Sequence, residues 1–251
     1  MKELVVINAD DLGMSPEVNT GTLEGIRGGF ISDASLLVKA PFTQSAVAGL
    51  KALGREHAGV HINLDEKLGW ASGGYELYPR PVLMERLKEP KVLELFFREA
   101  REQVELFLSF NLTLTHLDTH HHVHGFEPIF NVLMNLVDEY AIPAMRFSRQ
   151  GYFLSTRENI PYDPLVYLHM ETTLKEKGIY FCNRLLEGAS KIVEAGQGIT
   201  ELVVHPSRGG EIWRSEELKV IMSEVGVPSL KSRGIRLASF SDILSGEGLS
   251  S

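Results

Sequence analysis

The sequence predicts an α/β protein in which about seven parallel strands form a closed or nearly closed barrel. Short apolar runs alternate along the chain with longer segments of helical pattern, as in β–α–β units joined by right-handed crossovers. The length of 251 residues suits one large α/β domain, and we expect residues 1–251 to form a single domain. A doubly wound open sheet is the alternative fold. In both folds the ligand lies at the carboxyl ends of the strands.

The expected strands are short apolar runs, several of which end in polar or charged residues. The first run, residues 4–7, has the continuous apolar character of a strand that is buried on both faces. The later runs leave room for a helix between most neighbouring pairs. They cover residues 34–38, 59–62, 112–118, 144–147, 201–205 and 236–240.

The expected helices lie between these runs. The first has clear end signals, because Ser15 can cap its amino end, Pro16 suits its first turn, and Gly28-Gly29 ends it. Residues 64–86 have the glycines and prolines of a long loop, which is either a functional lid or a loop packed on the surface. Residues 148–182 carry no clear pattern. The other expected helices cover residues 42–53, 91–110, 128–140, 184–194 and 215–223.

The composition narrows the class of protein. Hydrophobic residues make up 43% of the chain, which is enough for a core without a structural metal, and the single cysteine, Cys182, excludes an internal disulfide. The net charge of −8 and the absence of a Lys/Arg block argue against a nucleic-acid partner. No apolar run approaches the roughly 18 residues of a membrane helix. We expect a cytoplasmic protein with a small-molecule substrate and no membrane partner. A homodimer is compatible with these features.

Five of the nine histidines lie within nine residues, 116–124, directly after an apolar run. Imidazole is the commonest metal ligand in proteins. If the strand continues, His116, Asp118 and His120 share one face, because residues two apart lie on the same side of a strand. If a helical turn begins there, His120 and His124 share a face instead. A solvated tract that binds metal adventitiously is the alternative, but the segment is internal and flanked by core-type sequence.

Other polar residues stand where expected strands end. Asp10 and Asp11 follow the first strand, His61 ends the third, Arg146 ends the fifth and His205 the sixth. In a parallel barrel these positions converge on one face. Each residue also has a structural interpretation: an aspartate can cap the following turn, either histidine can be satisfied within the core or by a backbone carbonyl, and Arg146 can form an ion pair instead of holding a substrate oxygen.

Together these residues suit metal-assisted hydrolysis. One aspartate and two histidines facing a cation leave coordination positions open. A cation in such a site activates water and polarises a carbonyl. A free carboxylate can take the water's proton, and a histidine can protonate a leaving amine. The chemistry that fits best is the hydrolysis of an amide or an ester.

Four motifs occur here in a characteristic order: Asp-Asp at 10–11, Gly-Val-His at 59–61, Thr-His-Leu-Asp-Thr-His-His-His-Val-His at 115–124, and Val-His-Pro at 204–206. With the closing segment 233–242 they resemble the YdjC-like carbohydrate deacetylases, the family of chitooligosaccharide deacetylase. The resemblance covers residues 4–243. It implies a distorted TIM-like (β/α) barrel that removes acetyl groups from N-acetylated saccharides.

The resemblance also implies residue roles. Asp11, His61 and His120 match the metal ligands of the family, Asp10 the proposed base and His205 the proposed acid. The remaining polar residues of the histidine-rich segment would support the ligands or contact the substrate, and we expect His122 and Arg146 to bind substrate. The remaining residues of that segment are His116, Asp118, His121 and His124.

Two questions stay open at this stage. The family is associated with magnesium, whereas two imidazoles suit zinc better, so the expected divalent cation is Mg²⁺ or Zn²⁺. The function has two alternatives: a metal-dependent phosphoesterase or other hydrolase on a similar barrel, and a metal-binding or sugar-binding protein without turnover. Against a phosphoesterase, the sequence has no second carboxylate-rich cluster for a second metal.

Overall fold

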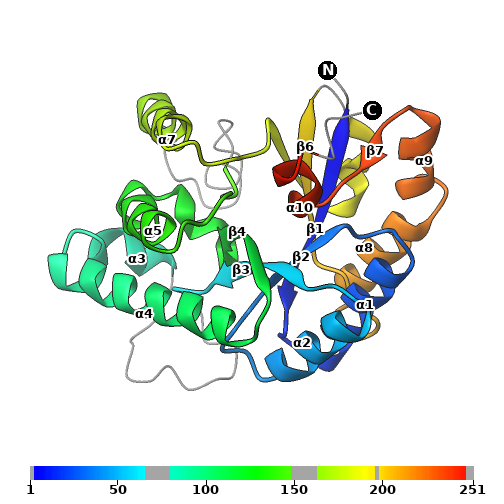
Figure 1. The fold of residues 1–251 in the computed structure, drawn as a ribbon, viewed down its shortest axis with the longest axis horizontal. Helices are drawn as coiled ribbons and strands as arrows, with labels where there is room; N and C mark the ends of the chain where they lie inside the picture. Colours follow the sequence, from blue (N-terminus) through cyan, green and yellow to red (C-terminus); the bar gives the residue numbers. More distant parts are fainter. Residues whose placement is uncertain (1–2, 66–79, 148–162, 196–197, 247–251) are drawn as a thin grey trace.

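A computed structural model describes residues 3–65, 80–147, 163–195 and 198–246. Its centre is a sheet of seven strands, all paired in parallel, with helices packed around it (Figure 1). The strand order is β4-β3-β2-β1-β6-β5, and β7 pairs with β1. The strands are β1 Leu4–Leu12, β2 Asp33–Leu36, β3 His57–Ile62, β4 Thr113–Thr119, β5 Arg184–Glu187, β6 Ile199–Val204 and β7 Arg236–Leu237.

Single-residue bridges continue the pairing from β4 towards β5. Leu117 of β4 bridges Met145, and Ala144 bridges Tyr180, both in parallel. The chain from Tyr180 leads directly into β5, which pairs with β6. The segment 180–187 therefore has parallel neighbours on both sides, so the strands run around a barrel that is distorted where only bridges remain. The expected α/β fold with parallel strands is confirmed.

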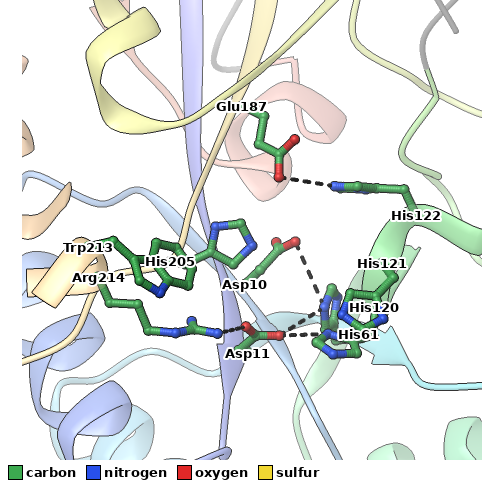
Figure 2. Close-up of a pocket in the computed structure, with 10 residues that line it drawn as sticks. All are labelled: Asp10, Asp11, His61, His120, His121, His122, Glu187, His205, Trp213 and Arg214. Atoms are coloured by element: carbon green, nitrogen blue, oxygen red, sulfur yellow. Dashed lines mark hydrogen bonds and ion pairs between the residues drawn. The ribbon is translucent and has the colours of Figure 1, made fainter. Parts of the chain in front are cut away.

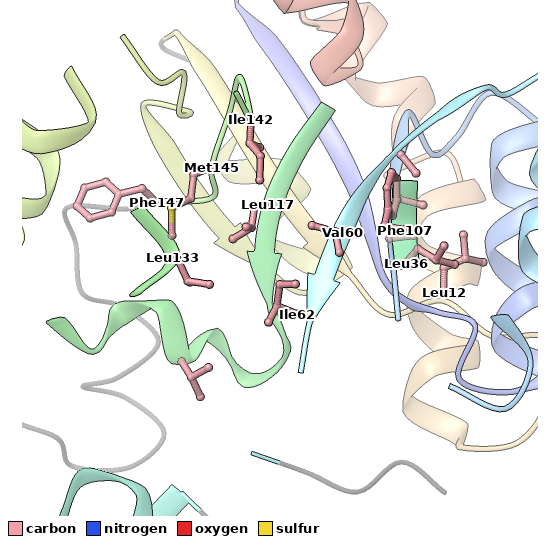
Figure 3. Packing of buried hydrophobic residues seen from close by; sticks show 14 of the residues in the cluster. Leu12, Leu36, Val60, Ile62, Phe107, Leu117, Leu133, Ile142, Met145 and Phe147 are labelled. Carbon is pink, nitrogen blue, oxygen red and sulfur yellow. The ribbon is translucent and has the colours of Figure 1, made fainter. Parts of the chain in front are cut away.

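The core follows from continuous apolar strands. Successive residues of β1 point to opposite sides, and all nine of its residues are buried, with Val5 and Ile7 in the main apolar cluster and Leu4 and Val6 in a second one. Figure 3 shows part of the main cluster between the neighbouring strands β2, β3 and β4. A strand buried on both faces requires helices outside it, and the chain supplies them.

The helices surround the sheet, and the first begins as expected. Ser15 caps α1 by accepting a hydrogen bond from the Val18 backbone nitrogen at 3.2 Å, and Pro16 occupies the first position. None of the helices in the described part of the chain is long and apolar enough to cross a membrane. The helices are α1 Pro16–Arg27, α2 Thr43–Ala52, α3 Arg80–Arg86, α4 Pro90–Ser109, α5 Glu127–Glu139, α7 Pro164–Glu176, α8 Ile212–Met222, α9 Val227–Ser232 and α10 Phe240–Leu244, with 3₁₀ turns η1 His120–Gly125 and η2 Ala189–Glu194.

Several element predictions need correction. The helix expected over 184–194 is wrong, because its first part is strand β5 and only η2 is helical, in a 3₁₀ turn. The final strand is shorter than the expected 236–240, since Ser239 accepts a hydrogen bond from the Asp242 backbone and starts α10. The expected loop 64–86 ends in helix α3, and α7 lies inside the unassigned 148–182. Residues 66–79 and 148–162 lie outside the described part.

Gly59 of β3 shows how tightly the barrel packs beneath its carboxyl end. A Cβ atom added at Gly59 would lie 2.3 Å from Nε2 of the buried His116. His116 cannot retreat, because its ring stacks on Phe240 at 4.0 Å and Nε2 lies 3.0 Å from the Ser35 hydroxyl. Gly59→Ala should therefore lower the free energy of unfolding by roughly 1–3 kcal/mol, as overpacked core substitutions do. Urea unfolding measures this.

Gly49→Ala is the matched control for Gly59→Ala. Its Cβ would also meet a side chain at 2.3 Å, but the contact is the Cδ1 end of the partly buried Leu23, which can rotate away. Alanine is also favoured over glycine inside helix α2. Gly49→Ala should change stability little. Equal unfolding midpoints for the two variants would contradict the rigid packing assigned to His116.

Candidate metal centre and catalytic cavity

A polar cavity of about 140 Å³ opens at the carboxyl ends of the strands. Figure 2 shows its walls, with Asp10 and Asp11 at the end of β1, His61 and the first histidines of η1 on one side, and His205 and the start of α8 on the other. The convergence expected from the strand ends is thus observed for most of the chosen residues. The cavity is lined by Asp10, Asp11, His61, His120, His121, His122, Glu187, His205, Trp213 and Arg214.

Asp10 and Asp11 both reach the cavity because β1 is irregular at its end. On a regular strand two adjacent side chains point to opposite faces. Here the register between β1 and β2 shifts between Ala9 and Leu12, and Asp11 has a φ of 66°, in the left-handed region that aspartate tolerates better than most residues. The turn brings the two carboxylates into one cavity in different orientations, as two separate roles require.

Asp11, His61 and His120 form a group with the geometry of metal ligands. The Oδ1 atom of Asp11 lies 2.9 Å from His120 Nδ1 and 3.4 Å from His61 Nε2. One possible ligand atom from each residue lies within 4.8 Å of the others, and all three side chains are buried. Burial alone would raise the pKa of Asp11, but the neighbouring His120 holds it well below its usual value.

Asp118 fixes the orientation of His61. The Nδ1 atom of His61 donates to Asp118 Oδ1 at 2.7 Å, which turns Nε2 towards the aspartates of β1. Ser35 in turn donates to Asp118 Oδ2 at 2.7 Å. Burial alone would lower the pKa of His61, but Asp118 and Asp10 outweigh it and raise the pKa to about 10. The surroundings therefore stabilise a positive charge at His61, which a cation can supply in place of a proton.

This donor set fits a divalent cation. The group offers one carboxylate oxygen and two imidazole nitrogens, an arrangement that leaves coordination positions open for water or substrate. Metal-binding histidines usually donate their other ring nitrogen to a carboxylate or carbonyl, as His61 does to Asp118. Two nitrogen ligands favour zinc or another transition metal over magnesium.

Arg146 does not line the cavity, so the expected substrate contact is not supported. Its side chain is fully buried, and its Nη1 and Nη2 atoms donate to the two oxygens of Asp10 at 2.7 Å each. Nη2 also lies 2.7 Å from Asp118 Oδ2, and Nε donates to Glu201 Oε1 at 2.8 Å. Three carboxylates from three strands thus surround the guanidinium, and its complete burial keeps it away from a substrate in the cavity. The structural ion pair, one of the two interpretations left open, is the one observed.

Arg146 and Asn8 hold Asp10 firmly. Asn8 Nδ2 donates to Asp10 Oδ1 at 2.8 Å, on the atom that also accepts from Arg146. Burial alone would raise the pKa of Asp10, but Arg146 and then His61 lower it well below the usual range. Asp10 is therefore ionised at every pH at which the protein would work, with a fixed orientation beside the metal-ligand group.

The histidine-rich segment divides its members between strand and turn. His116 lies on β4, is buried under Phe240, and has a pKa lowered by burial to about 4, so it stays neutral and away from the cavity. The strand ends at Thr119, and η1 contains two left-handed residues, His121 and His122, each with a φ of 55°. This break in the backbone lets three consecutive histidines, 120–122, line the cavity.

His122 and His205 stand on different walls of the cavity. His122 Nε2 lies 3.8 Å from Glu187 Oε1 at the end of β5. Burial and the charge of Arg146 keep the pKa of His122 well below its usual value, so the ring is neutral. His205 follows β6, and its Nδ1 lies 3.7 Å from Glu217 Oε2. Burial lowers its pKa, but Glu217 and the two aspartates of β1 outweigh this and raise it.

Sequence reasoning missed three residues of the cavity. Glu187 ends β5, a segment that was expected to be helical, so its place at a strand end was not visible. Trp213 and Arg214 lie in the first turn of helix α8, which begins at Ile212, three residues before the expected start at 215. An aromatic residue next to a charged one, nine residues after β6 ends at Val204, gives only a weak sequence signal. Arg214 donates from Nη2 to Asp11 Oδ2 at 2.7 Å.

The fold and these side chains define a parallel α/β barrel with a candidate Asp-His-His metal centre at the carboxyl ends of its strands. Residues 4–226 match the family model described as YdjC-like protein, and the chain belongs to this family. It is 27% identical to a carbohydrate deacetylase of Geobacillus stearothermophilus, over 96% of this chain and 98% of that protein. It is 32% identical to one of Clostridium beijerinckii, over 59% of this chain and 61% of that protein.

A solved structure supports the fold. A putative cellobiose-phosphate cleavage protein from Enterococcus faecalis V583 superposes with a TM-score of 0.76 at 20% identity, covering 97% of this chain and 99% of that one. At this identity the likeness concerns the fold alone. The expectation that the chain resembles the YdjC-like family is confirmed, and the catalytic roles of single residues stay predictions.

Proposed function

We propose that this protein is a divalent-metal-dependent deacetylase that removes acetyl groups from N-acetylated saccharides. The observation that carries the proposal is the grouping of Asp11, His61 and His120 in one cavity with a second carboxylate, Asp10, and a second kind of histidine, His205. The carbohydrate deacetylases to which the chain is similar over nearly its full length support the choice of substrate. We also propose that residues 1–251 act as one catalytic domain.

Asp11, His61 and His120 would hold the cation. When bound, the cation supplies Lewis-acid activation of the water and of the acetyl carbonyl. Asp118 keeps His61 in the tautomer whose Nε2 faces the group, and Arg214 holds the far oxygen of Asp11. Zinc is our first choice because of the two imidazoles, and magnesium, associated with the family, is the second.

The remaining side chains would move the protons. Asp10, ionised and fixed by Arg146, accepts the proton of the water that attacks the acetyl carbon. His205 gives a proton to the amide nitrogen as the carbon–nitrogen bond breaks, so that acetate and a free amino sugar leave. His122 on the opposite wall is neutral and can hydrogen-bond the substrate.

The two alternatives are weaker. A phosphoesterase with two metals needs a second ligand group, and the other candidate group in the described residues is Asp10, His61 and Asp118. That group shares His61 with the first, and Arg146 already binds both of its carboxylates at 2.7 Å. A non-catalytic binding protein would need neither Asp10 nor His205 in the cavity.

Release of free acetate tests the proposal. Metal-stripped protein should release none from N-acetylglucosamine and its β-1,4-linked dimer and trimer, and activity should return with zinc, magnesium, manganese or cobalt. The same preparations should not hydrolyse p-nitrophenyl phosphate. Phosphate release without acetate release would replace the proposal with the phosphoesterase, and metal binding with neither product would favour the non-catalytic protein.

A further inference from the structure

Trp213 is a large aromatic side chain at the rim of the catalytic cavity. It occupies the second position of α8, lines the cavity, and is 47% exposed. A half-exposed indole beside a polar site offers a large apolar surface on which a ligand can pack. The catalytic roles proposed above do not use it.

Arg214 fixes the ring from behind. Its guanidinium carbon lies 4.5 Å from the centre of the Trp213 ring, in cation–π contact. The guanidinium is itself held by Asp11 Oδ2 at 2.7 Å and by Glu211 Oε2 at 2.8 Å (Figure 2 shows the contact with Asp11). The guanidinium therefore lies over the indole and helps to hold its orientation, while 47% of the residue stays exposed.

The direction of the substrate brings a sugar to this ring. If the acetyl group lies at the Asp11 side and His205 protonates the amide nitrogen, the sugar that carries the nitrogen must extend past His205. The ring of His205 lies 5.5 Å from that of Trp213 at 60°. The half-exposed indole of Trp213 is thus the first group that the sugar meets beyond the proposed acid, His205. This step rests on the proposed function.

The size of the cavity agrees with this arrangement. Its volume of about 140 Å³ is well below the roughly 300–1,000 Å³ of pockets that enclose a whole ligand. The cavity can enclose the acetamide group, while most of a saccharide lies on the rim. Binding energy for the saccharide must then come from rim side chains, of which Trp213 is the largest apolar one in the described lining.

We propose that Trp213 is the platform on which a pyranose ring of the substrate stacks through its apolar C–H face. The ligand class is an uncharged pyranoside with equatorial hydroxyl groups, because such a ring has a flat C–H face. The platform determines specificity for saccharides over small acetylated compounds, and it takes no part in the bond-breaking steps.

Fluorescence of Trp213 tests binding without turnover. The chain has two tryptophans, so Trp70→Phe leaves Trp213 as the single emitter. Metal-stripped Trp70→Phe protein is titrated with the β-1,4-linked trimer of N-acetylglucosamine. We expect a saturable change in emission, which glycerol at the same concentration does not cause. The same titration is repeated with metal-loaded Asp10→Asn, Trp70→Phe protein, which should not turn over. If the trimer changes the emission of neither preparation at saturating concentration, the platform is overturned.

Kinetics separates a platform from a structural role. Trp213→Ala should raise KM for the trimer about 10–100-fold, the equivalent of one lost stacking contact, with a small change in kcat. Trp213→Phe should restore most of the affinity. Hydrolysis of trifluoroethyl acetate, an activated ester without a ring, should be unchanged. Ile212→Ala, 80% exposed and outside the cavity lining, is the neighbouring control.

The outcomes distinguish this inference from the proposed function. Acetate release with an unchanged KM in Trp213→Ala overturns the platform and leaves the deacetylase standing. Equal loss on the trimer and on the ester also overturns it, because the residue would then be structural. A saturable emission change without acetate release from any saccharide supports the platform and rejects the deacetylase.

Discussion

Replacing Asp10 by asparagine should leave the cation bound and lower kcat by about 10²–10⁴-fold, the usual effect of removing a general base. The structure adds a reason for a large effect. Both oxygens of Asp10 accept from Arg146, and the amide group of asparagine would place a donor against that guanidinium. The variant therefore loses the proton acceptor and also its fixed orientation.

Metal binding is the readout that identifies the role of Asp10. Titration calorimetry with zinc should give nearly unchanged affinity for Asp10→Asn, whereas His120→Ala should weaken binding strongly, because His120 Nδ1 lies 2.9 Å from the shared oxygen of Asp11. Circular dichroism and a melting curve for each variant exclude a folding defect. Near-normal activity in Asp10→Asn would show that the base lies elsewhere, with His122 as the next candidate.

Arg146 is the main cause of the low pKa of Asp10. A carboxylate with so low a pKa is a weak base, so its value to catalysis lies in position as well as in proton affinity. The buried network also includes Glu201, whose pKa burial raises to about 7 against the opposing charge of Arg146. Arg146 is thus a positioning residue in our proposal, and it acts on the substrate only through Asp10.

The parts of the site that the sequence predicted are those carried by local pattern. A four-residue apolar run followed by Asp10 and Asp11, or Gly-Val-His at 59–61, indicates a strand end directly, and parallel topology then brings the ends together. The histidine-rich segment was identified for the same reason. Its division at Thr119 was not, because both a continuing strand and a helical turn were compatible with the spacing.

The parts that were missed depend on partners far away in the chain. Leu185 and Leu186 are both buried, on opposite sides of a strand whose pairing with β6 no local pattern specifies, so β5 was read as a helix. Glu187 was missed with it. The strand expected over 144–147 is reduced to single bridges at Ala144 and Met145, so Arg146 follows a bridge and not a strand. Its burial against carboxylates from β1, β4 and β6 follows only from the closed arrangement of the strands.

Replacing His205 by alanine should slow amide hydrolysis severely, by about 10²–10⁴-fold, and spare an activated aryl ester. The amine leaves an amide only after it gains a proton, whereas an activated phenolate leaves without one. A metal ligand would behave differently, because its loss would affect both substrates together. Comparing kcat/KM of the variant on the trimer of N-acetylglucosamine and on p-nitrophenyl acetate therefore measures the acid role alone.

The pH profile provides a second, independent check on His205. A general acid must be protonated, so activity on the amide is present below the pKa of His205 and is lost as pH rises through it. Glu217 raises that pKa, which places the alkaline limb above the usual histidine value of about 6.5.

Glu217→Gln tests this cause of the raised pKa. It removes the charge but keeps a carbonyl oxygen that can accept from the His205 backbone nitrogen, which donates to Glu217 Oε2 at 2.6 Å. The alkaline limb for the amide should move to lower pH in this variant, and the ester profile should not. Two results together would contradict the acid role: an equal loss of activity on amide and ester in His205→Ala, and an alkaline limb that does not move in Glu217→Gln. His205 would then be a metal ligand or a structural residue.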